Sequence, residues 1–178
     1  MKLLFENWRQ YLKENEQGVA TFDFDDTLAI SHWDDEKGFV HDRENQEMID
    51  RLMDYHKKGF KIYIVTSRSE EKQDENGKWY SFNPKIKPPE RYIEDYQMPV
   101  QKFVEQYKLP IQDVIFTSGQ SKIETLKGLH SKVHHDDDPG DILDARANNI
   151  KAVISDPYGD YEELEASELQ QRREGVGK

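Results

Sequence analysis

Short apolar runs alternate with amphipathic stretches along most of the chain, and this alternation limits the possible folds more than any other feature. Strands are predicted at 19–24, 60–65, 113–116, 132–135 and 151–154, with dense apolar runs at 19–24, 62–65 and 114–116. The stretches with helical spacing lie at 44–58, 99–107, 121–129 and 141–148. Strands that alternate with helices across short connections build a parallel sheet covered by helices. The sequence therefore predicts an α/β fold, a Rossmann-like three-layer α/β/α sandwich with a five-stranded parallel sheet.

The length of 178 residues fits one domain of ordinary size. We assign residues 1–160 to that domain, with a first amphipathic helix that ends near Gly18, and residues 161–178 to a C-terminal helix and a flexible tail. A polar loop is expected between the first apolar run and the helix at 44–58. Residues 69–91 interrupt the alternation with a polar stretch that contains Asn76-Gly77, a hairpin turn signal. They predict a small flap.

The net charge of −11 disfavours non-specific binding to nucleic acid or to an anionic membrane, because both need a basic surface. The chain has no cysteine, which excludes disulfides and thiol chemistry. The apolar run before Glu6 is too short for a secretory signal, and no stretch reaches the length of a membrane span. We therefore expect a cytoplasmic protein without membrane contact.

Two acidic residues lie at the end of the first predicted strand. Asp23 and Asp25 alternate at the end of an extended strand, so their side chains share a face and address one site. Two carboxylates there suit a shared hard cation, or a division of work between a nucleophile and a general acid. An acidic loop that caps a helix is the structural alternative. Ligand sites of parallel sheets lie at the carboxyl ends of the strands, which favours the functional interpretation.

Three later segments place more polar residues at predicted strand ends. The segment 66–68 (Thr-Ser-Arg) offers hydroxyl and backbone N–H groups to a phosphate, although Thr and Ser also cap helices. Lys122 opens the next helix and would neutralise phosphoryl oxygens, although most lysines are solvated. The fourth run continues into the acidic segment 134–138, whose carboxylates repel one another unless a cation or strong donors lie among them. Asp141 alternatively acts only as a helix N-cap.

Together these segments resemble the four motifs of the haloacid-dehalogenase (HAD) superfamily of phosphatases, in the same order and each at a strand end. The resemblance spans residues 19–155. The matching residues are Asp23, Asp25 and Thr27 for the first motif, Thr66 for the second, Lys122 with Leu126 for the third, and Asp136, Asp137 and Asp141 for the fourth. The chain is similar to the acid phosphatases and nucleotidases of the superfamily, and around the first two motifs to polynucleotide 3′-phosphatase domains.

The resemblance implies a Mg²⁺-dependent phosphomonoester hydrolase with a phospho-aspartate intermediate. Asp23 would attack phosphorus, and Asp25 would protonate the leaving oxygen and later activate water. Thr66 would hold a phosphoryl oxygen while Lys122 balances the charge of nucleophile and phosphate. Lys127 is a second candidate for the motif lysine, with poorer spacing.

The metal ligands that the resemblance implies are the Asp23 carboxylate, the backbone carbonyl of Asp25 and members of the acidic cluster. The spacing to Asp141 selects Asp137 ahead of Asp136 by analogy, and Asp141 would orient the motif lysine or the waters of the metal. Two neighbouring histidines, at 134 and 135, would suit zinc. Every other candidate ligand is a carboxylate, which favours Mg²⁺.

The expected substrate is a nucleotide or a nucleic-acid end phosphate, because a site without a large cap is open to a large molecule. Trp79, which lies among Lys78, Lys85, Lys87 and Arg91, would stack a base, although it alternatively packs the flap onto the sheet. Thr27, Ser67 and Arg68 would contact the rest of the substrate. A phosphotransferase, a small-metabolite (sugar) phosphatase and a non-catalytic metal-binding module are the alternative functions.

Overall fold

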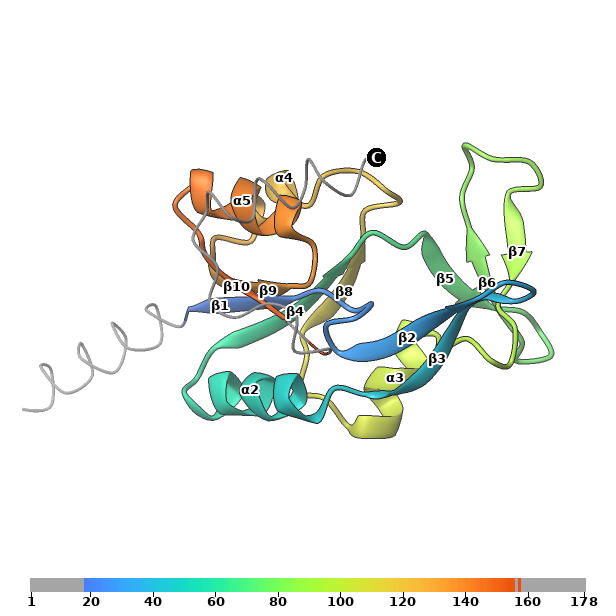
Figure 1. Cartoon of the computed structure of the whole chain (residues 1–178), viewed down its shortest axis with the longest axis horizontal. Coiled ribbons are helices and arrows are strands. Elements are labelled where there is room, and N and C mark those ends of the chain that lie inside the picture. Colours follow the sequence, from blue (N-terminus) through green and yellow to red (C-terminus); the bar gives the residue numbers. More distant parts are fainter. Residues whose placement is uncertain (1–17, 156, 158–178) are drawn as a thin grey trace, which may run out of the picture.

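A five-stranded parallel sheet forms the centre of the computed structural model, which describes residues 18–155 and 157. Its strands are β1 (Val19–Phe22), β4 (Lys61–Thr66), β8 (Asp113–Phe116), β9 (Ser131–Asp136) and β10 (Lys151–Ile154). They lie in the order β10-β9-β1-β4-β8, and every neighbouring pair is parallel (Figure 1). The α/β class and the five parallel strands predicted from the apolar runs are confirmed.

Helices lie on both sides of this sheet. They are α2 (Gln46–Lys57), α3 (Val100–Tyr107), α4 (Ile123–Gly128) and α5 (Pro139–Ala147). Figure 1 shows α4 and α5 on one side and α2 and α3 on the other. The side chain of Asp138 accepts the backbone N–H groups of Gly140 and Asp141, so Asp138 is the N-cap of α5. The N-cap role considered for Asp141 is therefore wrong.

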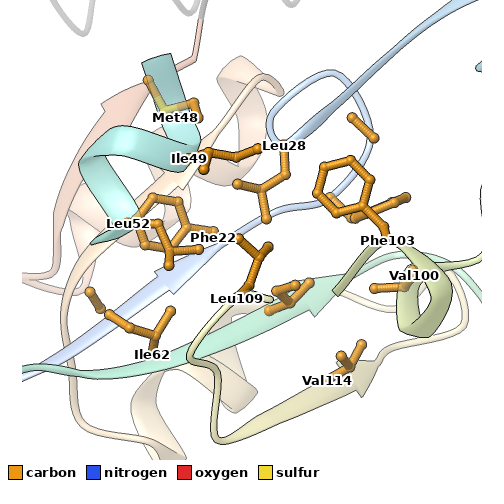
Figure 2. Close-up of a cluster of buried hydrophobic side chains, with 14 of the residues drawn as sticks. Phe22, Leu28, Met48, Ile49, Leu52, Ile62, Val100, Phe103, Leu109 and Val114 are labelled. Carbon is orange, nitrogen blue, oxygen red and sulfur yellow. The ribbon is translucent and has the colours of Figure 1, made fainter. Parts of the chain in front are cut away.

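Two apolar clusters hold the helices to the sheet. The first joins β1 and β4 to α2 and α3, and Figure 2 shows Phe22, Leu52 and Phe103 within it. The second includes Leu126 of α4 and Ile142 of α5. Each such side chain stabilises the fold by about 1.5–3 kcal/mol when it is fully buried. Because both faces of β1 and β4 are covered, these two strands are mostly apolar rather than alternating.

The expected polar loop after the first strand is instead an antiparallel hairpin, and the loop prediction is wrong. Its strands are β2 (Ala29–Asp34) and β3 (Gly38–Glu44). The turn is fixed locally, because the Asp34 carboxylate accepts two backbone N–H groups within it. The rings of Trp33 and Phe39 meet edge to face with their centroids 5.2 Å apart. The base of β2 is buried at Ala29 and Ile30, and cross-strand pairs of this kind stabilise the exposed half of the hairpin.

The residues of the predicted flap leave the parallel sheet and form a three-stranded antiparallel sheet of their own. Its strands are β5 (Glu70–Gln73), β6 (Trp79–Phe82) and β7 (Glu90–Tyr92). The predicted Asn76-Gly77 turn connects β5 and β6, and Gly77 has a φ of +77° there. We call this three-stranded unit the insert. Figure 1 shows it beside the β2–β3 hairpin, at the end of the molecule opposite β10.

Two of the predicted segments lie outside the described residues: the first helix before Gly18, and the C-terminal helix and tail at 161–178. Within the described part, both excursions from the parallel sheet are small antiparallel sheets, of two and three strands. No helix among the described residues is long and apolar enough to cross a membrane.

Candidate active site

The carboxyl ends of three adjacent strands bring the polar motif residues together. Asp23 directly follows β1, Thr66 ends β4 and Asp136 ends β9. The strand β1 lies between the other two, and the N–H of Asp23 donates to the carbonyl of His135 at 2.8 Å, just beyond the end of β1. Sheet register therefore holds residues from distant parts of the chain in one place, where ligand sites of parallel sheets are found.

A buried lysine lies among these residues. Lys122 is the N-cap residue of α4, and it is 3% exposed. Its Nζ lies 2.8 Å from a carboxylate oxygen of Asp23, 2.7 Å from one of Asp136 and 3.1 Å from one of Asp141. These contacts raise the pKa of Lys122 above its ordinary value although burial opposes the charge. One buried positive charge thus forms ion pairs with three carboxylates.

The carboxylates around Lys122 differ in how readily they ionise. Burial, followed by repulsion from Asp136, raises the pKa of Asp23 well above its ordinary value. The same two causes raise the pKa of Asp137 to about 8. Burial would also raise the pKa of Asp136, but the hydrogen bond from His134 and the charge of Lys122 outweigh it and lower that pKa. The cluster therefore favours the uptake of protons or of a further cation.

Three of these carboxylates are close enough to share an ion. Asp23, Asp136 and Asp137 each place one carboxylate oxygen within 4.8 Å of the others. The carboxylates of Asp25 and Asp141 are outside this group. Asp141 instead contacts Lys122, which is one of the two roles that the resemblance implied for it.

The metal-free protein should lose stability as the pH rises from about 6.5 to about 8. The pKa of Asp137 is about 8 in the folded protein against 3.8 in the unfolded chain. Over this window the folded state keeps a proton that the unfolded state has released. The neutral Asp137 side chain stabilises the fold fully at a pH below its pKa in the unfolded chain. This stabilisation is lost as the pH rises to its pKa in the folded protein. At about 1.4 kcal/mol per pH unit, the expected loss is about 2 kcal/mol.

Urea unfolding of chelator-treated protein at several pH values measures this slope. The control is Asp137→Asn, whose amide has the shape of the neutral acid and does not titrate. Its stability should change much less over the same window. A wild-type stability that rises with pH, or equal slopes in the two proteins, would contradict the assignment. The window stays above pH 6.5 because burial lowers the pKa of His135 to about 3, which gives the opposite slope in acid.

Buried hydrogen bonds support the acidic cluster from the interior of the sheet. The Nε2 of His134 lies 2.8 Å from Asp136 Oδ2, and its Nδ1 lies 2.9 Å from Thr21 Oγ1. The ring of His135 stacks on Phe22 with a centroid distance of 4.7 Å. Neither histidine belongs to the group of described residues whose ligand atoms lie together. The geometry therefore favours an oxygen-binding ion over the zinc alternative.

The carboxylate of Asp25 faces Arg68. The guanidinium donates from Nε and Nη2 to the two oxygens of Asp25, at 2.9 and 2.7 Å. Its Nη1 donates to Glu71 and to the carbonyl of Met98. The Cζ atom of the guanidinium lies 4.7 Å from the centre of the Phe24 ring. A planar bidentate contact of this kind fixes the orientation of a carboxylate. Arg68 is thus occupied by protein groups, whereas the sequence suggested a contact with substrate.

A pocket of about 520 Å³ opens beside the acidic cluster. Asp25 and Asp137 border it on the side of the parallel sheet, Phe39 and His41 border it from β3, and Arg91 borders it from the insert. The hairpin is tied to the residues that follow the insert by one backbone hydrogen bond, 2.9 Å long, from the N–H of His41. The volume is in the range of small-molecule sites.

The remaining predicted residues differ in their access to this pocket. Ser67 is exposed and borders it. Thr66 is buried, and its hydroxyl accepts the backbone N–H of Arg68 at 3.2 Å. Thr27 is fully buried, and its hydroxyl has no hydrogen-bond partner among the described residues. Thr27 and the half-buried Trp79 are not among the described residues that border the pocket.

The sequence interpretation missed Phe39, His41 and Glu71. One signal for the first two was available, because Phe39 and His41 alternate with other residues as on a half-buried strand. Glu71 had no local signal. It is buried and pairs with Arg68 three residues before it, and its contact with a separate segment is the N–H of Val100 at the start of α3, which it accepts.

Comparisons of the chain with models of known protein families and with curated protein sequences find no match. The resemblance to HAD phosphatases consequently rests on the four motifs, and what it implies about function is a proposal. The contacts of the described residues are the physical basis for that proposal.

Proposed function

We propose that this chain is a Mg²⁺-dependent phosphomonoester hydrolase of the HAD type, which acts through a phospho-aspartate on Asp23. The observation that carries the proposal is the buried Lys122, which contacts Asp23 at 2.8 Å beside two further carboxylates. Phosphoryl transfer depends mainly on positioning and on the cancellation of negative charge, and this arrangement suits both. In this proposal the helices on the two sides of the sheet form the three-layer arrangement of that superfamily.

The donor atoms of the cluster fit Mg²⁺. Asp23, Asp136 and Asp137 offer hard oxygen ligands within 4.8 Å of one another, which is the ligand type that Mg²⁺ prefers. The raised pKa values of Asp23 and Asp137 agree with such a site, because a divalent cation binds by displacing protons. When bound, the ion would neutralise charge on the phosphoryl oxygens.

Two observations support Asp137 as the more accessible ligand of the acidic cluster. Both oxygens of Asp136 already accept hydrogen bonds, Oδ2 from Lys122 and His134 and Oδ1 from the N–H of Asp138. Asp137, in contrast, borders the open pocket. The preference for Asp137 over Asp136 that was inferred by analogy therefore has a structural rationale.

In the proposed reaction, the Asp23 carboxylate attacks phosphorus, and the bond from phosphorus to the leaving oxygen breaks. The leaving oxygen takes a proton from Asp25, and water then hydrolyses the phospho-aspartate to release inorganic phosphate. Lys122 contacts Oδ1 of Asp23, which leaves Oδ2 as the attacking atom. The Thr66 hydroxyl accepts from a backbone N–H, so its own hydrogen is available to a phosphoryl oxygen.

Arg68 controls the position of the proton donor in this proposal. Both oxygens of Asp25 accept hydrogen bonds from Arg68. One of these two hydrogen bonds must therefore break before Asp25 can transfer a proton. Glu71 and the Met98 carbonyl hold the other side of the guanidinium. The insert and the start of α3 are thereby linked to the loop that carries the catalytic carboxylates.

The release of phosphate from a panel of esters, with and without Mg²⁺, tests the proposed function. The panel contains nucleoside 5′- and 3′-monophosphates, sugar phosphates and a 3′-phosphorylated oligonucleotide. We expect release from at least one ester, loss of that activity on chelation, and recovery when Mg²⁺ is restored. Addition of an acceptor alcohol separates hydrolysis from phosphotransfer. Release that chelation does not change, or no release from any ester by the folded protein, would contradict the proposal.

A further inference from the structure

We infer that the pocket beside the acidic cluster binds a leaving group with a flat aromatic ring, as in a nucleoside phosphate, and that this ring stacks on Phe39. The inference rests on the proposed function, because it assigns the pocket to the leaving group of the ester. It names the substrate class of that site and a residue of the chain that selects it.

The register of the β2–β3 hairpin decides which of its side chains face the pocket. Ser31 pairs with His41, and Trp33 pairs with Phe39. Alternate residues of a strand share a face, and Ser31, Phe39 and His41 all border the pocket. Trp33 therefore lies on the same face, farther toward the turn. This wall of the pocket continues outward as an aromatic surface.

That aromatic surface is open to solvent. Phe39 is 60% exposed and Trp33 is 64% exposed. Their rings meet at an interplanar angle of 84°, so the edge contact holds the Phe39 ring in place and leaves much of it accessible. Stacking on an aromatic side chain accepts any nucleobase, because every base has a π-face. A ring in this position suits a planar leaving group better than it suits a sugar.

The facing wall comes from the insert and is polar. Ser81 pairs with Arg91, and both border the pocket together with Ile93. Tyr92 also borders the pocket, but it alternates with these residues along β7, and its ring contacts Tyr80 on the other face. Among the described residues, Phe39 and Tyr92 are the aromatic side chains that border the pocket, and Phe39, at 60% exposed against 49% for Tyr92, has the more accessible ring on the face that lines it.

Arg91 gives this wall a positive charge. The other arginine of the pocket, Arg68, is neutralised by Asp25 and Glu71, whereas Arg91 forms no ion pair within the described part of the chain. A local cation helps an anionic substrate to approach a chain with a net charge of −11. An aromatic wall that faces a cationic wall, next to carboxylates that would hold the phosphate site, matches the base and phosphate of a nucleotide. Phe39 thus takes the role that the sequence suggested for Trp79.

The test compares two substrates that differ only in the base. These are ribose 5-phosphate and adenosine 5′-monophosphate, with the 3′-monophosphate as a second nucleotide. Wild type should have the higher kcat/KM for the nucleotide. Phe39→Ala should lower the nucleotide value by about 5- to 100-fold, mainly through KM, and should lower the ribose 5-phosphate value far less. Phe39→Trp should retain the preference. Ile86→Ala, which removes an exposed apolar side chain of the insert away from the pocket, is the control.

The outcomes separate this inference from the hydrolase proposal. Equal losses on both substrates in Phe39→Ala, or a wild type that prefers ribose 5-phosphate, would overturn the inference and leave the hydrolase standing. If no ester is hydrolysed, the binding of adenosine 5′-monophosphate in the presence of Mg²⁺, measured by calorimetry, tests the inference instead. Weaker binding by Phe39→Ala than by Ile86→Ala then supports the inference, and no binding by wild type overturns it.

Discussion

Replacing Asp23 with Asn should lower phosphate release by about 10⁴-fold or more, while the protein stays at least as stable as the wild type. The amide lacks the nucleophilic oxygen, so no phospho-aspartate forms. It also cannot ionise, which removes a buried charge that Asp136 repels. Lys122 keeps two carboxylate partners, Asp136 and Asp141, so the buried cation is still compensated. Loss of function without loss of stability is typical of a catalytic residue whose position is unfavourable for the stability of the fold.

Phosphate release measures the expected loss of activity, and thermal unfolding of the same preparations measures the expected stability. Asp50→Asn, on the exposed side of α2, is the matched control and should change neither quantity. Wild-type turnover by Asp23→Asn would rule out Asp23 as the nucleophile. An inactive variant that is also clearly less stable would instead show that Asp23 is mainly a structural partner of Lys122.

Replacing Lys122 with Met should destabilise the metal-free protein by about 3–5 kcal/mol and abolish activity. The methionine side chain has a similar length but no charge, so Asp23 and the fully buried Asp136 lose their cation. Leaving a buried charge without its partner is among the most destabilising single changes. The matched control is Lys127→Met on the same helix. Lys127 is exposed and pairs only with Glu124 among the described residues, so we expect a change below about 0.5 kcal/mol.

Urea unfolding of the two lysine variants gives the comparison, and a double variant tests its cause. If repulsion among unpaired carboxylates is responsible, Asp23→Asn should recover part of the stability lost in Lys122→Met, so the two changes would not be additive. A Lys122→Met protein as stable as Lys127→Met would show that Lys122 does not hold the cluster together. The electrostatic description of the site would then be wrong.

Four of the five central strands contain a short apolar run, and the pattern is clearest in β4, where Ile62, Ile64 and Val65 are all fully buried. The strand β9 differs, because most of its residues are polar although they are buried. The β2–β3 hairpin could not be predicted in this way. Only the start of β2 is buried, and the rest of the hairpin depends on pairing between exposed or half-exposed residues and on a local turn, neither of which produces a long apolar run. The first strand also ends earlier than its apolar run, at Phe22, where the chain turns into the acidic loop.

The site was predictable where sheet topology alone fixes it. Acidic residues that follow apolar runs had to meet at one edge of a parallel sheet, and Asp23 and Asp136 do so. The orientation of side chains was not predictable, because it depends on partners from other segments. Arg68 turns to Asp25 because Glu71 and Met98 hold its other side. The position of Phe39 depended on a hairpin that the pattern did not reveal.

Lys122 follows Asp23 by 99 residues, and this separation has a consequence for the newly made protein. On the ribosome, β1 emerges long before Lys122 and β9 exist. During that time the strand lacks one of its two neighbours, and Asp23 lacks its cation. Long-range pairings of this kind also form slowly, because a large loop must close before they are made. If the proposed function holds, a nascent chain carries Asp23 without the cation beside it, and activity would begin only when β9 has been synthesised and has docked.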